Sequence, residues 1–248
     1  MIQRSIGFIR SVFAILYSAF WCGAAVVWLI MFPKRSEFVL LKFAKKYWSA
    51  ILMRWIVGAK LDVSIHPETQ ELFDSGQGAV LISNHSSYLD INLAFASTPT
   101  SIVFIAKAGV KKVPLLGGAN ERVGTVFVER GNIKMAKKAI KQLETTLRGG
   151  RSVLVYPEGS RFSTNEIQPF KKGGFHLAAN AGAPVVPVYQ EGMSEILPPG
   201  QFNINKPTKP IYVRFGKPIY SSNVIELRDK CFEAVNDLQR ELKNQLKV

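Results

Sequence analysis

The chain has 248 residues, and its 32 lysines and arginines against 18 aspartates and glutamates give a formal net charge of +14. Hydrophobic residues make up 47% of the sequence, which excludes a disordered chain, and a mean hydropathy of +0.09 excludes a polytopic transporter. Two cysteines, Cys22 and Cys231, provide neither a disulfide framework nor a C-x-x-C motif. The excess of positive charge indicates an anionic partner: nucleic acid, an anionic membrane or a phosphorylated substrate.

The N-terminal segment holds the longest apolar run of the sequence. No residue between Ser11 and Pro33 is charged, and about 20 residues in a helix span a hydrocarbon core of ~30 Å. The apolar region of a signal peptide is shorter, roughly 7–15 residues, and a cleavage site of small residues follows it. The residues from Met31 to Lys34 form no such site. The run therefore predicts a membrane-anchoring helix, which could cross the bilayer or enter one leaflet.

A second apolar segment, Phe38 to Val57, is interrupted by cations. Its lysines and aromatic residues predict a helix at the headgroup boundary of a membrane. These residues are Lys42, Lys45, Lys46, Tyr47, Trp48 and Trp55. Because cations crowd the C-terminal side of the first run, the positive-inside rule predicts that the bulk of the chain lies on the cytoplasmic face of the inner membrane. We expect residues 1–60 to form membrane-anchoring helices and residues 61–248 to form the main domain.

Beyond these segments, short apolar runs alternate with amphipathic ones. The short runs are rich in Val, Ile and Phe and are bounded by Gly, Pro, Asn or Lys, which is typical of strands. They are Leu61–Ile65, Ala79–Ser83, Ser101–Ala106, Thr125–Val128, Ser152–Tyr156, Val185–Tyr189 and Ile211–Phe215. Apolar residues three and four apart predict helices over Ile133–Leu147 and from about Ser222 onward. The alternation predicts an α/β fold: a mixed, mostly parallel sheet flanked by helices and preceded by the membrane-associated helices.

His85 follows the strand at 79–83 directly, and Asp90 is five residues further along the chain. A step of five residues turns a helix by about 140°, so the two side chains share no helix face. They can meet if His85 stands in the turn before a helix that begins near Asp90, with Ser86 or Ser87 as its N-cap. The carboxylate would then hold one imidazole nitrogen and leave the other as a base near neutral pH. A capping loop with an incidental histidine explains the spacing equally well.

The other histidines, His66 and His176, have no motif around them, and we interpret both as structural. The sequence has no H-x-x-x-H or H-E-x-x-H motif to indicate a metal site. It also has no G-x-S-x-G elbow for a serine nucleophile, and the serines beside His85 have poor geometry for attack. His85 is therefore predicted to activate a hydroxyl group that belongs to the substrate.

Charged residues follow several other predicted strands, and a tight turn of proline, glutamate and glycine carries two of them. They are Lys107, Arg130, Glu158 and Arg161. Functional groups in α/β sheets gather at the C-terminal ends of strands, and an arginine fork suits a phosphate group. Taken alone, the turn at 156–161 is explained by a surface loop with a salt pair. Together with His85, the three cations Lys107, Arg130 and Arg161 predict a site for an anionic molecule that bears a hydroxyl group.

Taken in order, these blocks resemble the signature of the glycerolipid acyltransferases. They are Asn84-His85-x-x-x-x-Asp90, Phe104-Ile105-Ala106-Lys107 with Val113-Pro114, Gly124-x-x-Phe127-Val128-x-Arg130, Tyr156-Pro157-Glu158-Gly159-Ser160-Arg161, Phe170-Lys171-Lys172-Gly173 and Val186-Pro187-Val188. The resemblance covers residues 79 to 190, and the closest family is the 1-acylglycerol-3-phosphate acyltransferases. Their third block usually reads Phe-Pro-Glu-Gly-Thr-Arg. Tyr156 and Ser160 are mild departures, which leave open the lysolipid that is used.

The resemblance implies transfer of a fatty acyl group from acyl carrier protein or coenzyme A to the sn-2 hydroxyl of 1-acylglycerol-3-phosphate, which gives phosphatidic acid. It implies that His85 deprotonates the hydroxyl, which attacks the thioester without an acyl-enzyme, and that Asp90 orients His85. The implied substrate-binding residues are Lys107, Arg130 and Arg161 for the phosphate, and Glu158 and Gly159 for the glycerol. Backbone amides near His85 are candidates for stabilising the tetrahedral oxyanion. No metal or bound cofactor is implied.

Two alternatives stay open. An acyltransferase of the same superfamily could act on another acceptor, such as a lyso-ornithine lipid, another lysophospholipid or glycerol-3-phosphate. A non-catalytic basic module would bind an anionic membrane surface or nucleic acid. The sequence has no nucleic-acid-binding motif, and its strongest basic runs interleave with the apolar anchor, which favours the membrane and predicts no nucleic-acid partner.

Overall fold

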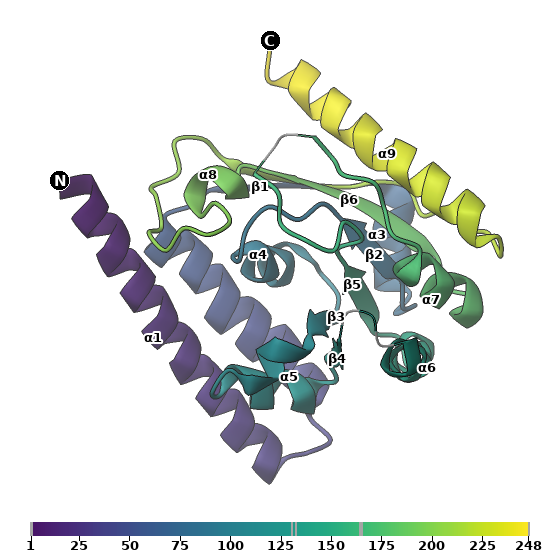
Figure 1. Ribbon diagram of the computed structural model, residues 1–248, viewed down its shortest axis with the longest axis horizontal. Helices are drawn as coiled ribbons and strands as arrows, with labels where there is room; N and C mark the ends of the chain where they lie inside the picture. The colour runs from purple at the N-terminus through teal and green to yellow at the C-terminus, as the bar shows by residue number, and fades with distance from the viewer. Residues whose placement is uncertain (1, 130, 132, 164–165, 248) are drawn as a thin grey trace.

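The computed structural model describes residues 2–129, 131, 133–163 and 166–247. Within these ranges, seven strands form one sheet in the order β1-β7-β6-β2-β5-β3-β4 (Figure 1). The strands are β1 Leu61–Ile65, β2 Val80–Ser83, β3 Ile102–Lys107, β4 Val126–Val128, β5 Ser152–Val155, β6 Val185–Glu191 and β7 Ile211–Phe215. Neighbouring strands pair in parallel, except that β6 and β7 run antiparallel. The predicted sheet is confirmed, with shifts at the ends of its strands.

The burial of each strand follows its place in the sheet. In the middle of the sheet, every residue of β2 and β5 is buried. Strands covered on both faces read as continuous apolar runs, as Val80–Ser83 does. In β7, buried residues alternate with half-buried ones, because one face is less covered. The edge strand β1 is largely exposed, and its Asp62 pairs with Arg214 at 2.9 Å. The best-covered strands are therefore the central ones.

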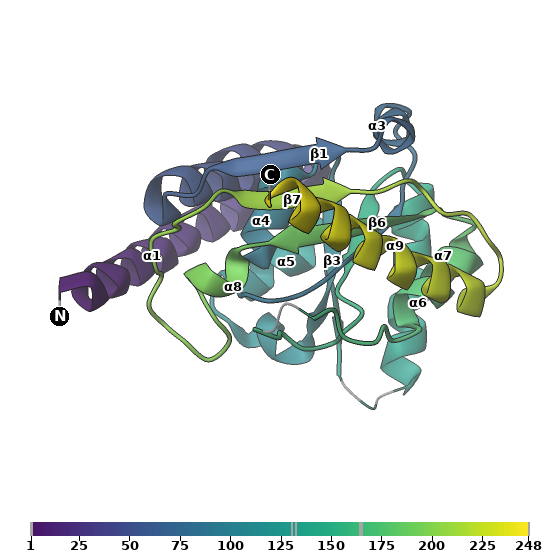
Figure 2. The same ribbon diagram turned by 90° about the horizontal axis from the view of Figure 1, so that it is seen from above.

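Helices cover both faces of the sheet (Figures 1 and 2). One face carries α6 Ile133–Arg148, α7 Gly173–Ala181 and α9 Val224–Gln245. The other carries α1 Ile2–Met31, α4 Asp90–Ser97, α5 Leu116–Val123 and the π-helical segments η1 Val39–Ala50 and η2 Leu52–Val57. Short helices complete the fold: α2 Ser36–Phe38, α3 Pro67–Asp74, η3 Ala108–Lys112 and α8 Met193–Ile196. The two helices predicted over 133–147 and from 222 onward are confirmed as α6 and α9.

The N-terminal helix α1 packs on the domain through a seam of small residues. Buried positions recur three, four or eight residues apart along it, at Gly7, Ser11, Ala14, Cys22, Ala25 and Leu29. The Ser11 hydroxyl accepts a hydrogen bond from the backbone N–H of Ile204 at 2.9 Å. A Cβ atom at Gly7 would lie 3.2 Å from the backbone oxygen of Ile204. The small side chains therefore let the first turns of α1 approach the loop after α8 closely.

The segment η1–η2, which follows α1, belongs to the core. Leu52 and Met53 are buried, and Trp48 donates its indole N–H to Ser18 Oγ at 2.9 Å. The prediction that Trp48 lies at a headgroup boundary is wrong, because its ring joins η1 to α1. Tyr47 and Trp55 on the same segment are exposed. The division of the chain at residue 60 stays a prediction.

We predict that Gly117→Ala destabilises the fold between β3 and β4. A Cβ atom at Gly117 would lie 2.0 Å from the backbone oxygen of Lys111, so η3 would have to shift. We expect the free energy of unfolding to fall by about 1–3 kcal/mol, measured by denaturant unfolding. Gly109→Ala is the matched control, because a Cβ atom there would meet no other atom within 4 Å. Equal stability of the two variants would contradict the predicted clash.

Candidate active site

Asp90, the first residue of α4, organises the turn that carries His85. Its Oδ2 atom accepts hydrogen bonds from His85 Nδ1 at 2.7 Å, from the backbone N–H of Ser86 at 2.7 Å and from that of Ser87 at 2.9 Å. The side chain of Asp90 is fully buried, and the N-terminus of a helix favours a negative charge. The turn curls back so that a five-residue step brings the two side chains together. The predicted meeting of His85 and Asp90 is confirmed, and Nε2 is left as the acceptor of the neutral imidazole.

The predicted N-cap of α4 is wrong. The serine side chains do not cap this helix; the hydroxyl of Ser87 instead accepts from the N–H of Leu89 at 3.2 Å and donates to the carbonyl of Leu197 at 2.8 Å. The backbone amides of Ser86 and Ser87 turn toward the Asp90 carboxylate. Ser87 therefore ties the His85 turn to the end of α8, and the carboxylate takes the stabilising role that a cap would have had.

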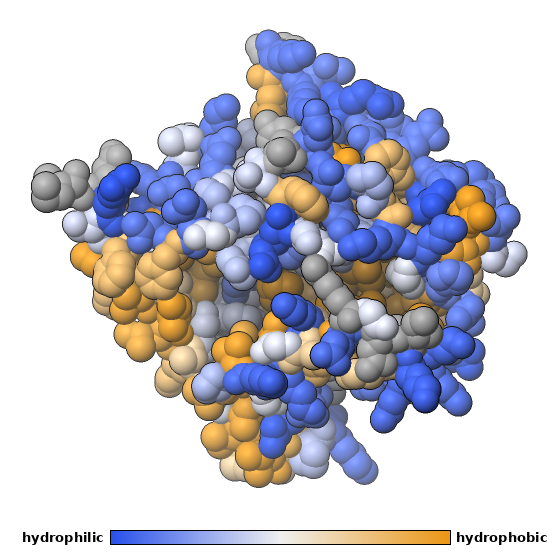
Figure 3. Space-filling view, viewed as in Figure 1, coloured by the Kyte–Doolittle hydropathy of each residue, from blue (hydrophilic) through white to orange (hydrophobic). Residues whose placement is uncertain are grey.

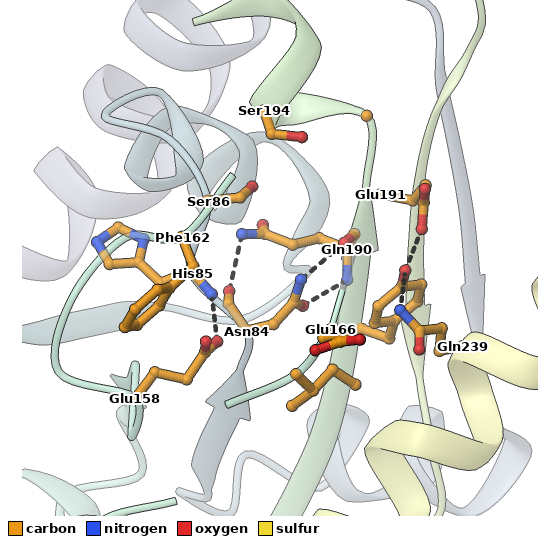
Figure 4. A pocket seen from close by; sticks show the side chains of 13 residues that line it. Asn84, His85, Ser86, Glu158, Phe162, Glu166, Gln190, Glu191, Ser194 and Gln239 are labelled. Atoms are coloured by element: carbon orange, nitrogen blue, oxygen red, sulfur yellow. Dashed lines mark hydrogen bonds between the residues drawn. The ribbon is translucent and has the colours of Figure 1, made fainter. Parts of the chain in front are cut away.

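The loop after β5 holds the backbone of His85 from both sides. The N–H of His85 donates to Glu158 Oε1 at 2.9 Å, and the N–H of Phe162 donates to the carbonyl of His85 at 3.0 Å. Figure 4 shows the Glu158 carboxylate directed at the backbone nitrogen of His85. The other oxygen of Glu158 accepts from the N–H of Gln168 at 3.4 Å. In the structure, Glu158 therefore positions the backbone of His85.

Glu158 has an unusual proton affinity for a carboxyl group. Its side chain lies in the interior beside Asp90, and burial raises the pKa of Glu158 from 4.5 to about 7. The negative charge of Asp90 adds to this rise, while the hydrogen bonds from the backbone amides of His85 and Gln168 oppose it. The Glu158 carboxyl group is therefore protonated over part of the pH range in which an exposed glutamate is charged.

Asn84 and Gln190 lock the end of β2 to the end of β6. The Asn84 side chain accepts from the N–H of Gln190 and donates to its carbonyl, both at 2.9 Å. The Gln190 side chain donates to the carbonyl of Asn84 at 2.9 Å, and Figure 4 shows the three bonds together. Gln190 was not among the predicted site residues, because no motif marks it. Its place after the Val-Pro-Val run, at the end of a predicted strand, was the available signal.

The imidazole of His85 is stacked on an aromatic ring. The ring centroids of His85 and Tyr156 lie 4.0 Å apart, with 12° between their planes. The His85 side chain is 14% exposed, and the residue is one of those that line a small polar hollow of about 20 Å³. This hollow is lined by Asn84, His85, Ser86, Glu158, Phe162, Glu166, Ile167, Tyr189, Gln190, Glu191, Gly192, Ser194 and Gln239. The stacked ring of Tyr156 and the hydrogen bond from Nδ1 to Asp90 together hold the imidazole in one orientation.

The structure brings one of the predicted cations to the turn that carries His85. The guanidinium of Arg161 lies over the ring of Tyr88, 3.7 Å from its centroid, and Tyr88 belongs to the His85 turn. Lys107, the last residue of β3, is exposed, and the structure does not show it touching His85 or Arg161. Arg130 lies outside the described residues. Of the predicted phosphate ligands, Arg161 is thus the one that the structure connects to the base.

Gly159 allows a lysine to approach the same loop. Its φ is +74°, and a Cβ atom at this position would lie 2.3 Å from Nζ of Lys171. The backbone N–H of Lys171 donates to the carbonyl of Pro157 at 3.0 Å, which fixes the two segments together. Lys171 therefore brings a cation that the strand-end argument did not include. The role of Gly159 in holding glycerol stays a prediction.

The arrangement is suited to base catalysis on a substrate hydroxyl group. A buried carboxylate holds one imidazole nitrogen, a stacked ring supports the imidazole, and Arg161 lies over Tyr88 of the same turn. The amides of His85, Ser86 and Ser87 donate to Glu158 or Asp90. These three amides are therefore engaged elsewhere, and the suggestion that amides next to His85 stabilise an oxyanion does not hold for them.

Known proteins share this sequence pattern and this fold. The sequence model of the Acyltransferase family matches residues 64–191, just over half of the chain. The chain is similar to the chloroplastic 1-acyl-sn-glycerol-3-phosphate acyltransferase BAT2 of Brassica napus, with 31% identity over 86% of this chain and 64% of the relative. It is 34% identical to the 1-acyl-sn-glycerol-3-phosphate acyltransferase of Saccharomyces cerevisiae over 68% of this chain and 55% of the relative. The chain thus spans less than two thirds of each relative.

A solved structure shows the same fold over almost the whole chain. The crystal structure of the 1-acyl-sn-glycerophosphate acyltransferase PlsC from Thermotoga maritima aligns with a TM-score of 0.81, at 22% identity, over 98% of this chain and 97% of that one. The α/β fold with its N-terminal helices is therefore a known arrangement. Because the family match covers just over half of the sequence and contains His85, Asp90 and the loop at 156–161, the chain belongs to the Acyltransferase family.

Proposed function

We propose that the chain is a 1-acylglycerol-3-phosphate O-acyltransferase, which forms phosphatidic acid from a lysolipid and an acyl thioester. The observation that carries this proposal is the bond from His85 Nδ1 to the buried carboxylate of Asp90 at 2.7 Å, within the region that matches the Acyltransferase family. The names of the Brassica napus and Saccharomyces cerevisiae relatives state the same activity.

In the proposed reaction, Nε2 of His85 takes the proton of the sn-2 hydroxyl while the hydroxyl oxygen attacks the thioester carbonyl carbon. The new C–O bond forms, the C–S bond breaks, and the thiol leaves with the proton that His85 took. Asp90 holds the Nδ1 proton throughout and stabilises the imidazolium. General-base assistance of this kind contributes ~10²–10⁴ in rate. The thioester donor is acyl carrier protein or coenzyme A, and no metal or resident cofactor takes part in the proposed steps.

Arg161 is proposed to hold the phosphate of the acceptor, with Lys107 and Arg130 as its expected partners. Its Nε atom is buried and has no hydrogen-bond partner among the described residues. The ring of Tyr88 below the guanidinium leaves the edge of the fork as its hydrogen-bonding side. An arginine fork matches two phosphate oxygens, whereas a lysine provides a point charge. Glu158 and Gly159 are proposed to lie beside the glycerol.

We propose that α1 lies in one leaflet of the membrane, on the cytoplasmic face. By length and composition, Arg4–Met31 is apolar enough to cross a bilayer. Figure 3 shows apolar side chains gathered along this helix, and the large exposed ones include Ile6, Phe8, Ile9, Phe13, Leu16, Phe20, Val27, Ile30 and Met31. The opposite side of α1 packs on the domain from Gly7 to Leu29. A crossing helix would lose these contacts, whereas a helix in the plane of the leaflet keeps them.

Exposed cations follow α1 in the chain and also lie on η1, which packs against α1. Lys34 and Arg35 follow the helix and are exposed, and Lys42 and Lys46 are exposed on η1. Each cation near an anionic leaflet contributes ~1 kcal/mol to membrane attachment. In both ribbon views α6 lies away from α1, so its lysines do not extend this surface (Figures 1 and 2).

We predict that His85→Ala lowers turnover by ~10²–10⁴, because the base that activates the hydroxyl is lost. The assay supplies 1-acylglycerol-3-phosphate in membranes with an acyl thioester and identifies phosphatidic acid by mass. His176→Ala is the matched control, since His176 is exposed on α7. Turnover at the wild-type level in purified, folded His85→Ala would contradict the proposed mechanism.

The same assay tests the acceptor and the donor. A panel of lysolipids and glycerol-3-phosphate is offered with acyl-carrier-protein and coenzyme A thioesters in turn. The proposal expects phosphatidic acid as the main product. Preferred acylation of a lyso-ornithine lipid, of another lysophospholipid or of glycerol-3-phosphate would replace the proposed acceptor and leave the role of His85 in place.

Glu158 is predicted to make stability depend on pH in a defined direction. Because its folded pKa is raised from 4.5 to about 7, the folded protein keeps a proton that the unfolded chain has lost in this window. The proton held by Glu158 therefore stabilises the folded state. This stabilisation is complete below about pH 4.5 and is lost as the pH rises through about 7. The melting temperature of the wild type should therefore fall more steeply over this window than that of Glu158→Gln. Parallel curves for the two proteins would contradict the raised pKa.

We predict that replacing Phe13 and Phe20 by serine lowers binding to anionic liposomes by at least about tenfold, because two large apolar side chains no longer enter the leaflet. Both are more than half exposed on α1. The matched control replaces Tyr220 and Ile225, which are exposed before and at the start of α9. Liposome flotation measures both proteins. Equal loss in the two double variants would show that α1 is not the membrane face.

A further inference from the structure

The carboxylate of Asp90 is hydrogen-bonded unevenly. The Oδ2 atom accepts from His85, Ser86 and Ser87, as described above. The Oδ1 atom is buried and has no hydrogen-bond partner among the described residues. Buried carboxylate oxygens are nearly always satisfied, because an unpaired one costs the full desolvation penalty. Since the Asp90 side chain is fully buried, a bound substrate would not reach Oδ1. The partner of this atom has to be internal.

A second buried polar atom without a partner belongs to Tyr156, which lies against the same pair. Its ring is stacked on the imidazole of His85, and its hydroxyl oxygen has no hydrogen-bond partner among the described residues. Burial raises the pKa of Tyr156 well above its ordinary range, and the charge of Asp90 raises it further. The buried hydroxyl group thus belongs to the residue that stacks on His85, and it experiences the charge of Asp90.

Stacking on His85 requires the ring of Tyr156 but not its hydroxyl group. A phenylalanine would provide the same stacked ring without a polar atom. The hydroxyl oxygen is buried, where an unpaired hydroxyl is costly. An acceptor at Oδ1 and a donor at the tyrosine oxygen are complementary. One internal water commonly joins such groups, since buried waters make about three hydrogen bonds to otherwise unpaired polar atoms.

We propose that the Tyr156 hydroxyl and Asp90 Oδ1 share one internal water molecule, and that Tyr156 is a positioning residue for the His85–Asp90 pair. The tyrosine donates to the water, and the water donates to Oδ1. This bond holds the carboxylate so that Oδ2 stays on the imidazole, and it offsets part of the negative charge that His85 experiences. The activity measurements below rest on the proposed function; the structural measurements do not.

Several charged or titratable groups contact the His85 turn or lie in it. Asp90 comes from α4, His85 from the turn before it, and Glu158 and Arg161 from the loop that begins with Tyr156. Removing the hydroxyl leaves all four in place. With Oδ1 unpaired, the Asp90 carboxylate acts more strongly on the imidazolium and favours the charged ring. Loss of the hydroxyl should therefore move the protonation of His85 to higher pH.

The test is Tyr156→Phe, which keeps the stacked ring. We expect the acid limb of the pH profile of kcat/KM to move to higher pH by about 0.5 unit. The pH titration of the His85 imidazole resonances in NMR spectra should move in the same direction, while those of His66 and His176 stay in place. The melting temperature should fall, because Oδ1 loses its partner. Tyr220→Phe, on an exposed tyrosine, is the matched control and should change none of these.

If the Tyr156 hydroxyl group has no partner, Tyr156→Phe should give the opposite results. Tyr156→Phe would then melt at a higher temperature, and the His85 titration would stay in place or move to lower pH; either outcome overturns the proposal. In an Asp90→Asn background, adding Tyr156→Phe should no longer move the His85 titration, and an undiminished shift would show that the hydroxyl does not act through Asp90. Because NMR and melting need no turnover, a wild-type protein without acyltransferase activity would refute the proposed function and leave this test intact.

Discussion

One buried carboxylate oxygen, Oδ2 of Asp90, determines the geometry of the site. It accepts from the imidazole of His85 and from two consecutive backbone amides, so the orientation of the base, the shape of the turn and the start of α4 depend on the same atom. A buried charge is tolerated when several donors satisfy it. Losing any one of these three hydrogen bonds would weaken the geometry that the other two maintain. The pair is consequently a rigid unit, which is what proton transfer at a fixed nitrogen requires.

The sheet places this unit by joining strand ends rather than by packing the histidine side chain. β2 pairs with β5 on one side and β6 on the other, all in parallel, so their C-terminal ends meet at one edge. There Glu158 accepts a hydrogen bond from the N–H of His85, and the N–H of Phe162 donates to the carbonyl of His85. The side chain of Gln190 donates to the carbonyl of Asn84. The base is therefore held by its backbone, and the loop with Arg161 lies beside it. His85 thus lies in a turn fixed to the ends of rigid strands, and the neighbouring loop carries Arg161.

The apolar face of α1 and the cation at the site, Arg161, lie on different surfaces of the same domain. Small residues let α1 pack on the domain, which leaves its large side chains outward, next to exposed cations at the end of the helix. Arg161 instead lies at the turn that carries the base, over Tyr88. The proposed function requires both: attachment at the membrane surface and a cation for the lysolipid phosphate close to His85. The proposed membrane face and the site share one core, because α1 and η1 pack into the same cluster as the sheet.

Local pattern determined much of this protein. Seven strand runs and the helices over 133–147 and from 222 onward could be predicted because hydrophobic periodicity within a few residues dictates them. The spacing of His85 and Asp90 permitted their contact but left a capping loop as an equal alternative. The Asn84–Gln190 bonds, the contact of Glu158 with the His85 backbone and the burial of Trp48 were decided by the tertiary structure alone. These contacts join segments up to 106 residues apart. They depend on which strands and helices become neighbours, and an apolar run specifies that it will be buried without specifying what will cover it.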